Sequence, residues 1–355
     1  MSRITTMGSP AMTVPKPRQR SAAERARTRT FALSLLAFFV VLAALDLIIT
    51  GLGSPPSYVP DVVLNENTGV PPVPTNADFP YDRGHNLWAI VLLGGLGLAG
   101  LLLCIRDIVK KNDWLPFFAS LGTVVIVVPE VFVDIIGMVY YPVSDGDHAF
   151  DLFGRQMGWF ILAGWFGAGA FAVSTLKVLL TRPKAKHVWV FMGVTCLSYT
   201  IFEEILVGFG GIYHYYGNQP MWWHELPIWW TPCNAIGCAL LPAAVAYRYQ
   251  HLLKGWKASA MLLVVPAGVA AAYAIIGMPS WIVVNGDYNW FVTELAGLST
   301  WALAIALTAM ILNVFLGYEP FDPESRPWDF SETDDAAVPG ETAAVVEAHA
   351  ARVTV

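Results

Sequence analysis

Eight stretches of the chain are each about as long and as apolar as a membrane-spanning helix. Because a helix rises only about 1.5 Å per residue, crossing the hydrocarbon core of a bilayer takes roughly 20 apolar residues. Hydrophobic residues make up 55% of the 355 and charged residues 14%, a balance that is rare in water-soluble proteins of this size. The pattern predicts an all-α, polytopic membrane bundle of about eight transmembrane helices. The predicted spans are residues 31–50, 87–105, 115–140, 157–180, 188–212, 228–247, 258–284 and 289–316.

Three segments fall outside the predicted spans. Residues 1–28 carry basic side chains among Ser, Pro and Ala, and this composition predicts a disordered cytoplasmic leader. Residues 52–86 are rich in Pro, Asn and Asp and predict a long extracytoplasmic loop. Residues 318–355 turn acidic and Ala-rich, which predicts a disordered cytoplasmic tail. The transmembrane domain is therefore expected to cover residues 29–317, and its first span is retained because no A-x-A cleavage site precedes Gly51.

Positive charges fall in alternate loops, and this predicts how the chain crosses the membrane. Short cytoplasmic loops of membrane proteins carry an excess of Lys and Arg. The opposite loops of this chain hold only Arg83 and Arg155. We therefore expect a multi-pass protein of the cell membrane with both termini cytoplasmic, in agreement with an even number of spans. The basic residues that set this orientation are Arg106, Lys110, Lys111, Arg182, Lys184, Lys186, Arg248, Lys254 and Lys257.

One apolar run, residues 124–141, carries two carboxylates. Glu130 and Asp134 stand four residues apart, so they share one face of a helix. A carboxylate that faces lipid costs roughly 2.5 to 3.5 kcal/mol on insertion scales, and such residues normally face a protected interior instead. Pro129 has no N–H to donate, so we expect it to kink the helix just before the acids. A kinked helix with two acids on one face predicts a pocket.

Four further acids lie at the same predicted depth, in the outer halves of three other spans. Coincidence at one depth in four helices indicates a shared polar cavity that opens toward the outer leaflet. For an acid near the end of its span, snorkelling toward the headgroups is an equal alternative. A structural alternative also stays open, in which the acids tie helices together through neighbours such as Asn234, Tyr140 or Arg155. The four acids are Asp46, Glu203, Glu204 and Glu294.

The sequence also contains a weak internal repeat. Sliding the chain by 74 residues lays Glu130 on Glu204, and sliding it by 140 lays residues 135–138 on residues 275–278. Repeated helical hairpins of this kind would place the third and fifth spans around a common centre. Because Glu203 and Glu204 point about 100° apart on a helix, only one of them is expected in the cavity. The repeat favours Glu204.

Aromatic side chains gather at the same outer ends of the spans. An interfacial belt explains most such residues in membrane proteins, but a belt would occupy both ends, and the inner loops carry far fewer aromatics. Ring faces stabilise cations by about 2 kcal/mol or more each once water is excluded. An aromatic basin beside an acid therefore favours carbocation chemistry. The residues expected to bind substrate are Asp46, Tyr140, Tyr141, Tyr213, Trp230, Asn234, Trp281 and Glu294.

Clustered carboxylates in a medium of low dielectric constant cannot all ionise at low cost. One of them is expected to keep its proton beside an ionised partner, which is the arrangement that a general acid needs. We expect Glu130 or Glu204 to be the proton donor and Asp134 to be its partner or the terminal base. Glu203 completes the set of candidate catalytic residues.

No metal or other cofactor is predicted. The chain contains no H-x-x-x-H, E-x-x-H or H-E-x-x-H pattern, and it lacks phosphate-binding loops, nucleophile elbows and dinucleotide fingerprints. A ligand set assembled from separate helices stays open as an alternative. The net charge of −6 and the placement of basic residues in short loops do not indicate nucleic acid as a partner.

Carboxylates set among aromatic-rich spans of a small helical protein are the features on which a family resemblance rests. In this architecture the chain resembles the integral-membrane terpene cyclases of meroterpenoid and indole-terpenoid pathways. The resemblance implies a cofactor-free, protonation-initiated cyclisation of a polyene or epoxidised prenyl chain that reaches the site laterally from membrane lipid. This chain is longer, with an extra span and tails, and no motif aligns residue by residue, so no catalytic residue is carried over.

The sequence thus predicts a membrane-embedded enzyme that acts on a lipophilic terpenoid or prenyl substrate by carboxylate general-acid catalysis. A lipid hydratase or isomerase and a metal-dependent membrane oxygenase are alternatives within the enzyme class. A proton-coupled small-molecule transporter would also need acids in its spans, but it should alternate access, and no constellation of acids, Asn or Gln reaches the inner halves. A structural or chaperone-like membrane subunit would need no pocket.

Overall fold

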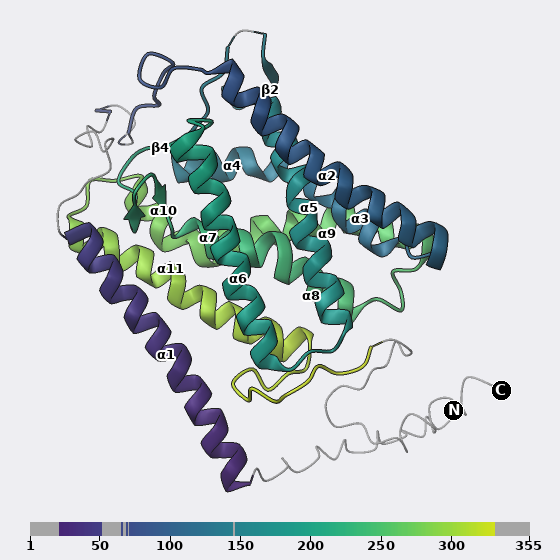
Figure 1. Cartoon of the computed structure of the whole chain (residues 1–355). Coiled ribbons are helices and arrows are strands. Elements are labelled where there is room, and N and C mark those ends of the chain that lie inside the picture. The colour runs from purple at the N-terminus through teal and green to yellow at the C-terminus, as the bar shows by residue number, and fades with distance from the viewer. Residues whose placement is uncertain (1–20, 52–64, 67–68, 70, 145, 331–355) are drawn as a thin grey trace, which may run out of the picture.

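The computed structural model describes residues 21–51, 65–66, 69, 71–144 and 146–330, which form a bundle of helices (Figure 1). The all-α fold class predicted from the sequence is confirmed, because helices make up most of the described chain and its strands form only two-stranded sheets. In chain order, the helical elements are α1 (Ala22–Gly51), α2 (Arg83–Lys111), α3 (Leu115–Val124), α4 (Val127–Gly137), α5 (Trp159–Leu180), α6 (Ala185–Glu204), α7 (Trp230–Asn234), α8 (Leu241–Arg248), α9 (Met261–Ala272), α10 (Met278–Val284) and α11 (Trp290–Met310), with the π-helical segments η1 (Ile205–Phe209), η2 (Ala235–Leu240), η4 (Tyr273–Gly277) and η5 (Ile311–Phe315) and the 3₁₀ segment η3 (Gly255–Ala260).

Six helices in the described part of the chain are long and apolar enough to cross a membrane, and the bent pair α3 and α4 makes a seventh if it is one span. The sequence predicted eight. The remaining run, residues 228–247, is helical from Trp230 to Arg248, but Asn234 and its other polar residues make it less apolar than the rest. Nearly all of this helix is buried by other helices, so it needs few side chains that suit lipid. The six are Ala22–Gly51, Arg83–Lys111, Trp159–Leu180, Ala185–Phe209, Gly255–Val284 and Trp290–Phe315.

The helix predicted over residues 115–140 is broken just before its two acids. α3 ends at Val124, α4 begins at Val127, and the two differ in direction by 43°. Pro129 explains where the break falls, because a proline ring clashes with the carbonyl four residues earlier, here that of Val125, and has no N–H to bond it. The kink predicted from Pro129 is therefore confirmed.

Short strands form at one end of the bundle, which we call the hairpin end. Figure 1 shows β2 and β4 there, beyond the ends of the long helices. The pairing of β1 with β4 joins the chain that leaves α4 to the chain that leaves η1, so it holds α4 and α6 together at this end. The antiparallel pairs are β1 (Val139–Tyr140) with β4 (His214–Tyr215), β2 (His148–Leu152) with β3 (Arg155–Gly158), and β5 (Trp222–Trp223) with β6 (Leu226–Pro227).

The described part of the predicted 52–86 loop packs onto the hairpin end. The ring of Phe79 stacks on His214 with the ring centroids 3.9 Å apart. Burial lowers the pKa of His214 to about 4, so this imidazole is neutral at pH 7. Asp82 then caps α2, its Oδ1 accepting from the His85 N–H over 2.8 Å, and the helix starts a few residues earlier than predicted because of this cap.

The opposite end of the bundle carries the basic loops, and we call it the basic end. The predicted disordered tail is wrong for residues 318–330, which pack against this end. Tyr318 and Phe330 are buried, the Tyr318 hydroxyl donates to the Pro183 carbonyl over 2.8 Å, and the Tyr247 hydroxyl donates to the Trp328 carbonyl over 2.7 Å. Aromatic residues anchor a stretch whose average composition is polar. The rest of the predicted tail lies outside the described residues.

Acidic residues of this packed stretch pair with the basic loops. Glu324 is hydrogen-bonded by Lys184 and Lys186, and these bonds lower the pKa of its carboxyl to about 2. Asp329 pairs with Arg182 over 2.7 Å. The acidic and basic patterns that the sequence placed on one side of the membrane are therefore partners in the fold.

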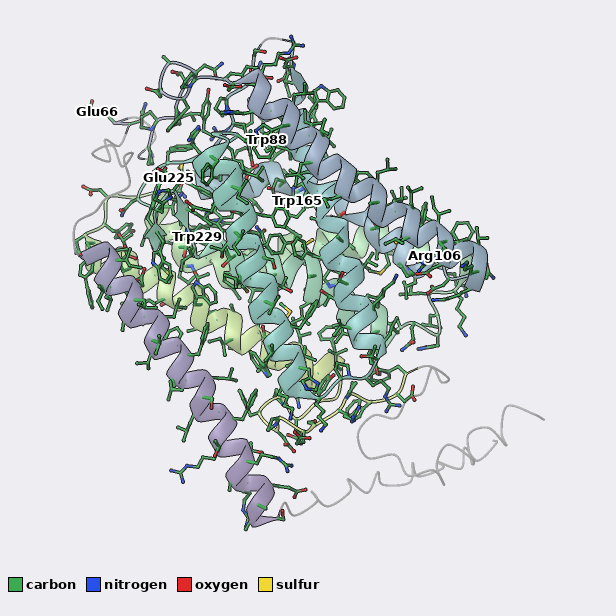
Figure 2. The ribbon with its side chains drawn as sticks, in the orientation of Figure 1. Glu66, Trp88, Arg106, Trp165, Glu225 and Trp229 are labelled. Atoms are coloured by element: carbon green, nitrogen blue, oxygen red, sulfur yellow. The ribbon has the colours of Figure 1, made fainter. Side chains whose placement is uncertain are left out.

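Both described ends of the chain meet at the basic end. Arg27 Nε lies 3.1 Å from Asp322 Oδ1, which joins the start of α1 to the segment after η5. The first helix begins at Ala22, so the prediction that the leader extends to residue 28 is wrong at its boundary; residues 1–20 lie outside the described part. In Figure 2 the side chain of Arg106 lies at the far end of α2, away from the interior where Trp165 and Trp229 lie.

Candidate active site

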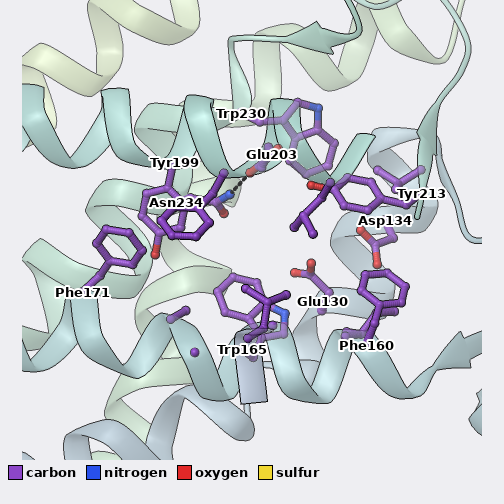
Figure 3. A pocket seen from close by; sticks show the side chains of 18 of the residues that line it. Glu130, Asp134, Phe160, Trp165, Phe171, Tyr199, Glu203, Tyr213, Trp230 and Asn234 are labelled. Carbon is purple, nitrogen blue, oxygen red and sulfur yellow. Dashed lines mark hydrogen bonds between the residues drawn. The ribbon is translucent and has the colours of Figure 1, made fainter. Parts of the chain in front are cut away.

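Three carboxylates line one cavity inside the bundle, toward the hairpin end. The cavity has a volume of about 270 Å³ and lies with α2 and α5 on one side and α6 on another. Glu130 and Asp134 reach it from α4, and Glu203 reaches it from α6 (Figure 3). The shared cavity predicted from the depth of the acids is therefore present for these three.

Glu203 is the acid with the most hydrogen-bond donors. The Tyr215 hydroxyl donates to its Oε2 over 2.6 Å, and the Asn234 amide donates to its Oε1 over 2.8 Å. Asn234 is itself oriented by the Tyr273 hydroxyl, which donates to its Oδ1 over 2.6 Å. Donors on both oxygens favour the ionised form of a carboxyl. Of the three acids, Glu203 therefore has the donors best placed to hold a negative charge.

Glu130 and Asp134 have fewer partners. Asp134 accepts a hydrogen bond of 2.8 Å from the Tyr141 hydroxyl. Glu130 receives no hydroxyl or amide donor from the described residues; its carboxyl faces the cavity with the Trp165 indole beside it (Figure 3). The Trp165 indole is hydrogen-bonded to it, whereas Glu203 has donors on both of its oxygens, so Glu130 has less support for a negative charge than Glu203. Glu130 is therefore the acid best placed to hold a proton.

Aromatic rings form most of the cavity wall. Phe160 and Tyr213 stack with centroids 6.0 Å apart, and Trp230 lies 5.3 Å from the rings of both Tyr215 and Tyr273. Such faces stabilise a cation in a water-poor site. The aromatic lining residues are Tyr141, Phe160, Trp165, Phe171, Tyr199, Phe202, Tyr213, Tyr215, Trp230 and Tyr273.

Three π-helical segments adjoin the residues of the cavity. η1 begins two residues after Glu203, η2 begins immediately after Asn234, and η4 begins at Tyr273. A π-turn inserts one extra residue into a helix and is frequent at functional sites. These three segments shift the helix register next to Glu203, Asn234 and Tyr273, whereas the fourth, η5, lies away from the cavity.

The cavity also depends on a close approach at Gly137. A Cβ at this position would lie 2.3 Å from the Trp230 ring, so only glycine lets the indole pack on the end of α4. This contact places Trp230 over the helix that carries Glu130 and Asp134. The residue after the glycine, Met138, caps α4 in the left-handed conformation with φ 56°.

Of the residues predicted to bind substrate, Tyr141, Tyr213, Trp230 and Asn234 line this cavity. The others lie elsewhere. Tyr140 donates to Asn76 Oδ1 over 2.7 Å in a neighbouring pocket, and Trp281 stacks behind Tyr273 with centroids 5.9 Å apart.

Asp46 and Glu294 form a second, separate acid pair. Asp46 is fully buried on α1 and accepts from the Trp223 indole over 3.0 Å, while Glu294 on α11 accepts from the Met221 N–H over 2.7 Å. Neither lines the acid cavity. The expectation that they share the cavity of the other acids is wrong, because equal depth along the helices does not imply that two side chains face the same space, and this pair lies where α1 packs against α11.

The prediction that Glu204 shares the cavity is wrong. Its carboxylate instead pairs with the exposed His224 at the hairpin end, and this hydrogen bond raises the pKa of the imidazole. The buried face of α6 runs through Thr195, Tyr199 and Glu203, at helical spacing, so the neighbouring position 204 points away. This spacing is present in the sequence and was a better signal than the weak repeat.

Sequence reasoning missed the contribution of α5. Phe160, Trp165 and Phe171 from this helix line the cavity, and Gly167 on the same helix lets α2 approach closely, because a Cβ there would lie 2.9 Å from the Leu93 carbonyl oxygen. The part of this helix that lines the cavity is aromatic, interrupted by glycines and uncharged, so it carries no chemical signal of its own. Its role follows only from the packing of α5 against α2 and beside α4.

The fold and the site define a membrane-type helical protein with an internal acid cavity. Within the described residues, no group of three His, Cys, Asp or Glu side chains is arranged to hold a metal ion. No family model, curated protein or solved structure matches the chain. The geometry of the cavity is therefore the feature that bears on function.

Proposed function

We propose that the chain is a membrane-embedded enzyme that protonates a lipophilic prenyl or terpenoid substrate, with cyclisation as the reaction. One observation carries this proposal: three carboxyl groups converge on an aromatic-walled cavity in which, among the described residues, Glu203 has a hydroxyl and an amide donor while Glu130 has only the Trp165 indole. An acid and a carboxylate held apart in this way can donate a proton at one point and accept one at another.

The proposed reaction begins with proton transfer from Glu130 to the substrate. The O–H bond breaks, and a C–H bond forms at an alkene carbon, or an epoxide oxygen is protonated as its C–O bond breaks. The neighbouring π electrons close the ring, and aromatic faces such as those of Trp230 and Tyr213 stabilise the cation that results. Glu203 then accepts a proton from the adjacent carbon, which restores a double bond. The step is an isomerisation, so it requires no oxidant or reductant.

The proposed substrate reaches the site from the bilayer. Leu93 and Leu96 of α2 and Leu206 of η1 contribute aliphatic surface to the cavity, which suits a prenyl chain. Such chains partition into lipid, so a lateral route between helices is expected. The alternatives of lipid hydratase, isomerase or metal-dependent oxygenase would use the same lining.

Solvent deuterium tests the proposed chemistry. We expect the full chain in lipid nanodiscs, supplied with geranylgeranyl acetate and its terminal epoxide in D₂O, to convert the polyene to a cyclic isomer with one deuterium on carbon, because Glu130 exchanges its proton with solvent. Mass spectrometry of the product measures this. A cyclic product without label would contradict protonation at carbon, and a product heavier by one water would favour the hydratase.

We also propose that the protein lies in the cell membrane with both termini in the cytoplasm. The basic residues gather at the end where Arg27 meets Asp322, and that end is the cytoplasmic one by the positive-inside rule. We expect Ala77→Cys, at the hairpin end, to react with an impermeant maleimide on intact cells, and Ala23→Cys to react only after permeabilisation. The four native cysteines are buried or half-buried, so background labelling is low. The reverse pattern would contradict this topology.

A further inference from the structure

A second pocket adjoins the acid cavity at the hairpin end, and we call it the vestibule. It has a volume of about 470 Å³ and lies between β1, β3 and the residues 73–76 that precede α2. Asp134, Val139 and Tyr141 line both the vestibule and the acid cavity. The two spaces therefore meet at Asp134 and at Tyr141, whose hydroxyl bonds it. Where the cavity wall is aromatic and aliphatic, the vestibule adds amide, hydroxyl and guanidinium groups.

Arg155 supplies the positive charge of the vestibule. Its Nη2 donates to the Tyr216 hydroxyl over 2.8 Å, whereas its Nη1 is buried and has no hydrogen-bond partner among the described residues. A guanidinium stays charged at every physiological pH, and a buried N–H without an acceptor is costly. The geometry of Arg155 is therefore incomplete without an acceptor, and the adjoining vestibule has room for one.

We propose that the vestibule binds the carboxylate head of an amphiphile whose apolar chain lies in the acid cavity. The proposal rests on the proposed function for the lipophilic nature of the chain. At about 270 Å³ the cavity alone is smaller than the roughly 300 to 1,000 Å³ of most ligand pockets, whereas cavity and vestibule together fall within that range. A ligand with one polar and one apolar part fits the change in lining at Asp134.

A carboxylate suits the vestibule better than a more highly charged head. A guanidinium presents a planar fork that matches the two oxygens of a carboxylate. Asp134 faces the same space, and its repulsion of a head group grows with the negative charge of that head, so a single charge meets the least. One anionic head near Asp134 also favours the protonated form of that acid, which supplies the cluster with a proton when substrate is bound.

A fluorescent polyene acid tests the head-group site without any turnover. Binding of cis-parinaric acid and of its methyl ester to the full chain in nanodiscs is measured by energy transfer from tryptophan. We expect the wild type to bind the acid at least tenfold more tightly than the ester. Arg155→Gln should weaken the acid about 10- to 100-fold, the range expected for a lost hydrogen bond to a charged group, and change the ester less than twofold.

The matched control is Arg83→Gln, which removes an exposed arginine at the same end of the bundle that pairs with Asp147 over 3.4 Å. This variant should leave both affinities unchanged. Equal binding of acid and ester by the wild type, or an acid preference that survives in Arg155→Gln, would overturn the proposal. If Arg155→Gln no longer binds the ester, the variant is misfolded. The preference of the wild type for the acid over the ester then decides whether the proposal stands. Since no turnover enters the measurement, this result and the test of the proposed chemistry can fail separately.

Discussion

Replacing Glu130 by Gln is expected to lower turnover of a prenyl substrate by about 10²- to 10⁴-fold, the usual contribution of a positioned general acid. The amide keeps the size of the side chain and its place beside Trp165, but it cannot deliver a proton. Folding should be retained, because the amide oxygen of Gln can still accept the hydrogen bond from the Trp165 indole. Conversion by membranes that carry the variant at matched expression is the measurement.

Asp134→Asn is the companion to this variant. If Asp134 only adjusts the proton affinity of its neighbour and relays protons, its turnover should fall between that of Glu130→Gln and that of the wild type. Wild-type turnover in Glu130→Gln would show that the acid is structural, and the cyclase proposal would fall with it. Activity that disappears on chelation and returns with one added metal would instead make these carboxylates ligands.

Much of the fold follows from the length of the apolar runs, because the bilayer leaves few alternatives to helices. The break before α4 was also predictable, since Pro129 acts through local sterics. The helix from Trp230 to Arg248 was predicted as a span, yet its environment is other helices, and hydropathy alone cannot separate a lipid-facing helix from an enclosed one. Burial of Tyr318 and Phe330 could not be predicted, because a few aromatic anchors hold a stretch that is polar on average.

The sequence singled out the acids of the candidate site, but it did not show which of them face one another. Glu130, Asp134 and Glu203 were singled out because acids within apolar runs are costly, and these three meet in one cavity. Asp46 and Glu294 satisfied the same argument but lie between α1 and α11, because depth is one coordinate and the order of helices around the bundle is another. Sequence spacing fixes which residues share a face of one helix, but which faces meet depends on tertiary packing.

The adjacent acids Glu203 and Glu204 test whether the face of the helix, and not only the position along it, decides which acid acts on the substrate. Glu203→Gln is expected to lower turnover by about 10²- to 10³-fold, the range seen when one preorganised electrostatic group is removed, because the site loses both its negative charge and its proton acceptor. Glu204→Gln should stay within threefold of the wild type, since it alters only a partly exposed pair with His224. Both variants are compared in nanodiscs at matched loading, with thermal stability measured in parallel.

Both variants replace a glutamate by glutamine at adjacent positions, so each loses the same charge. At matched loading, a difference in turnover between them therefore reflects the position of the acid. In Glu203→Gln the amide can turn its NH₂ toward the Tyr215 hydroxyl, which then accepts instead of donating, and keep its oxygen on the Asn234 amide. The Tyr215 hydroxyl loses its acceptor in this arrangement, so some loss of stability is expected. Tyr273→Phe, which removes a bond that orients Asn234 and keeps both acids, measures how much turnover depends on this hydrogen-bond network. If Glu204→Gln proves the more damaging variant, the helical face assigned to α6 is incorrect and the internal repeat was the better guide. If both variants turn over like the wild type, the charge on α6 does not act on the substrate, and only Glu130 and Asp134 remain as candidates for the chemistry.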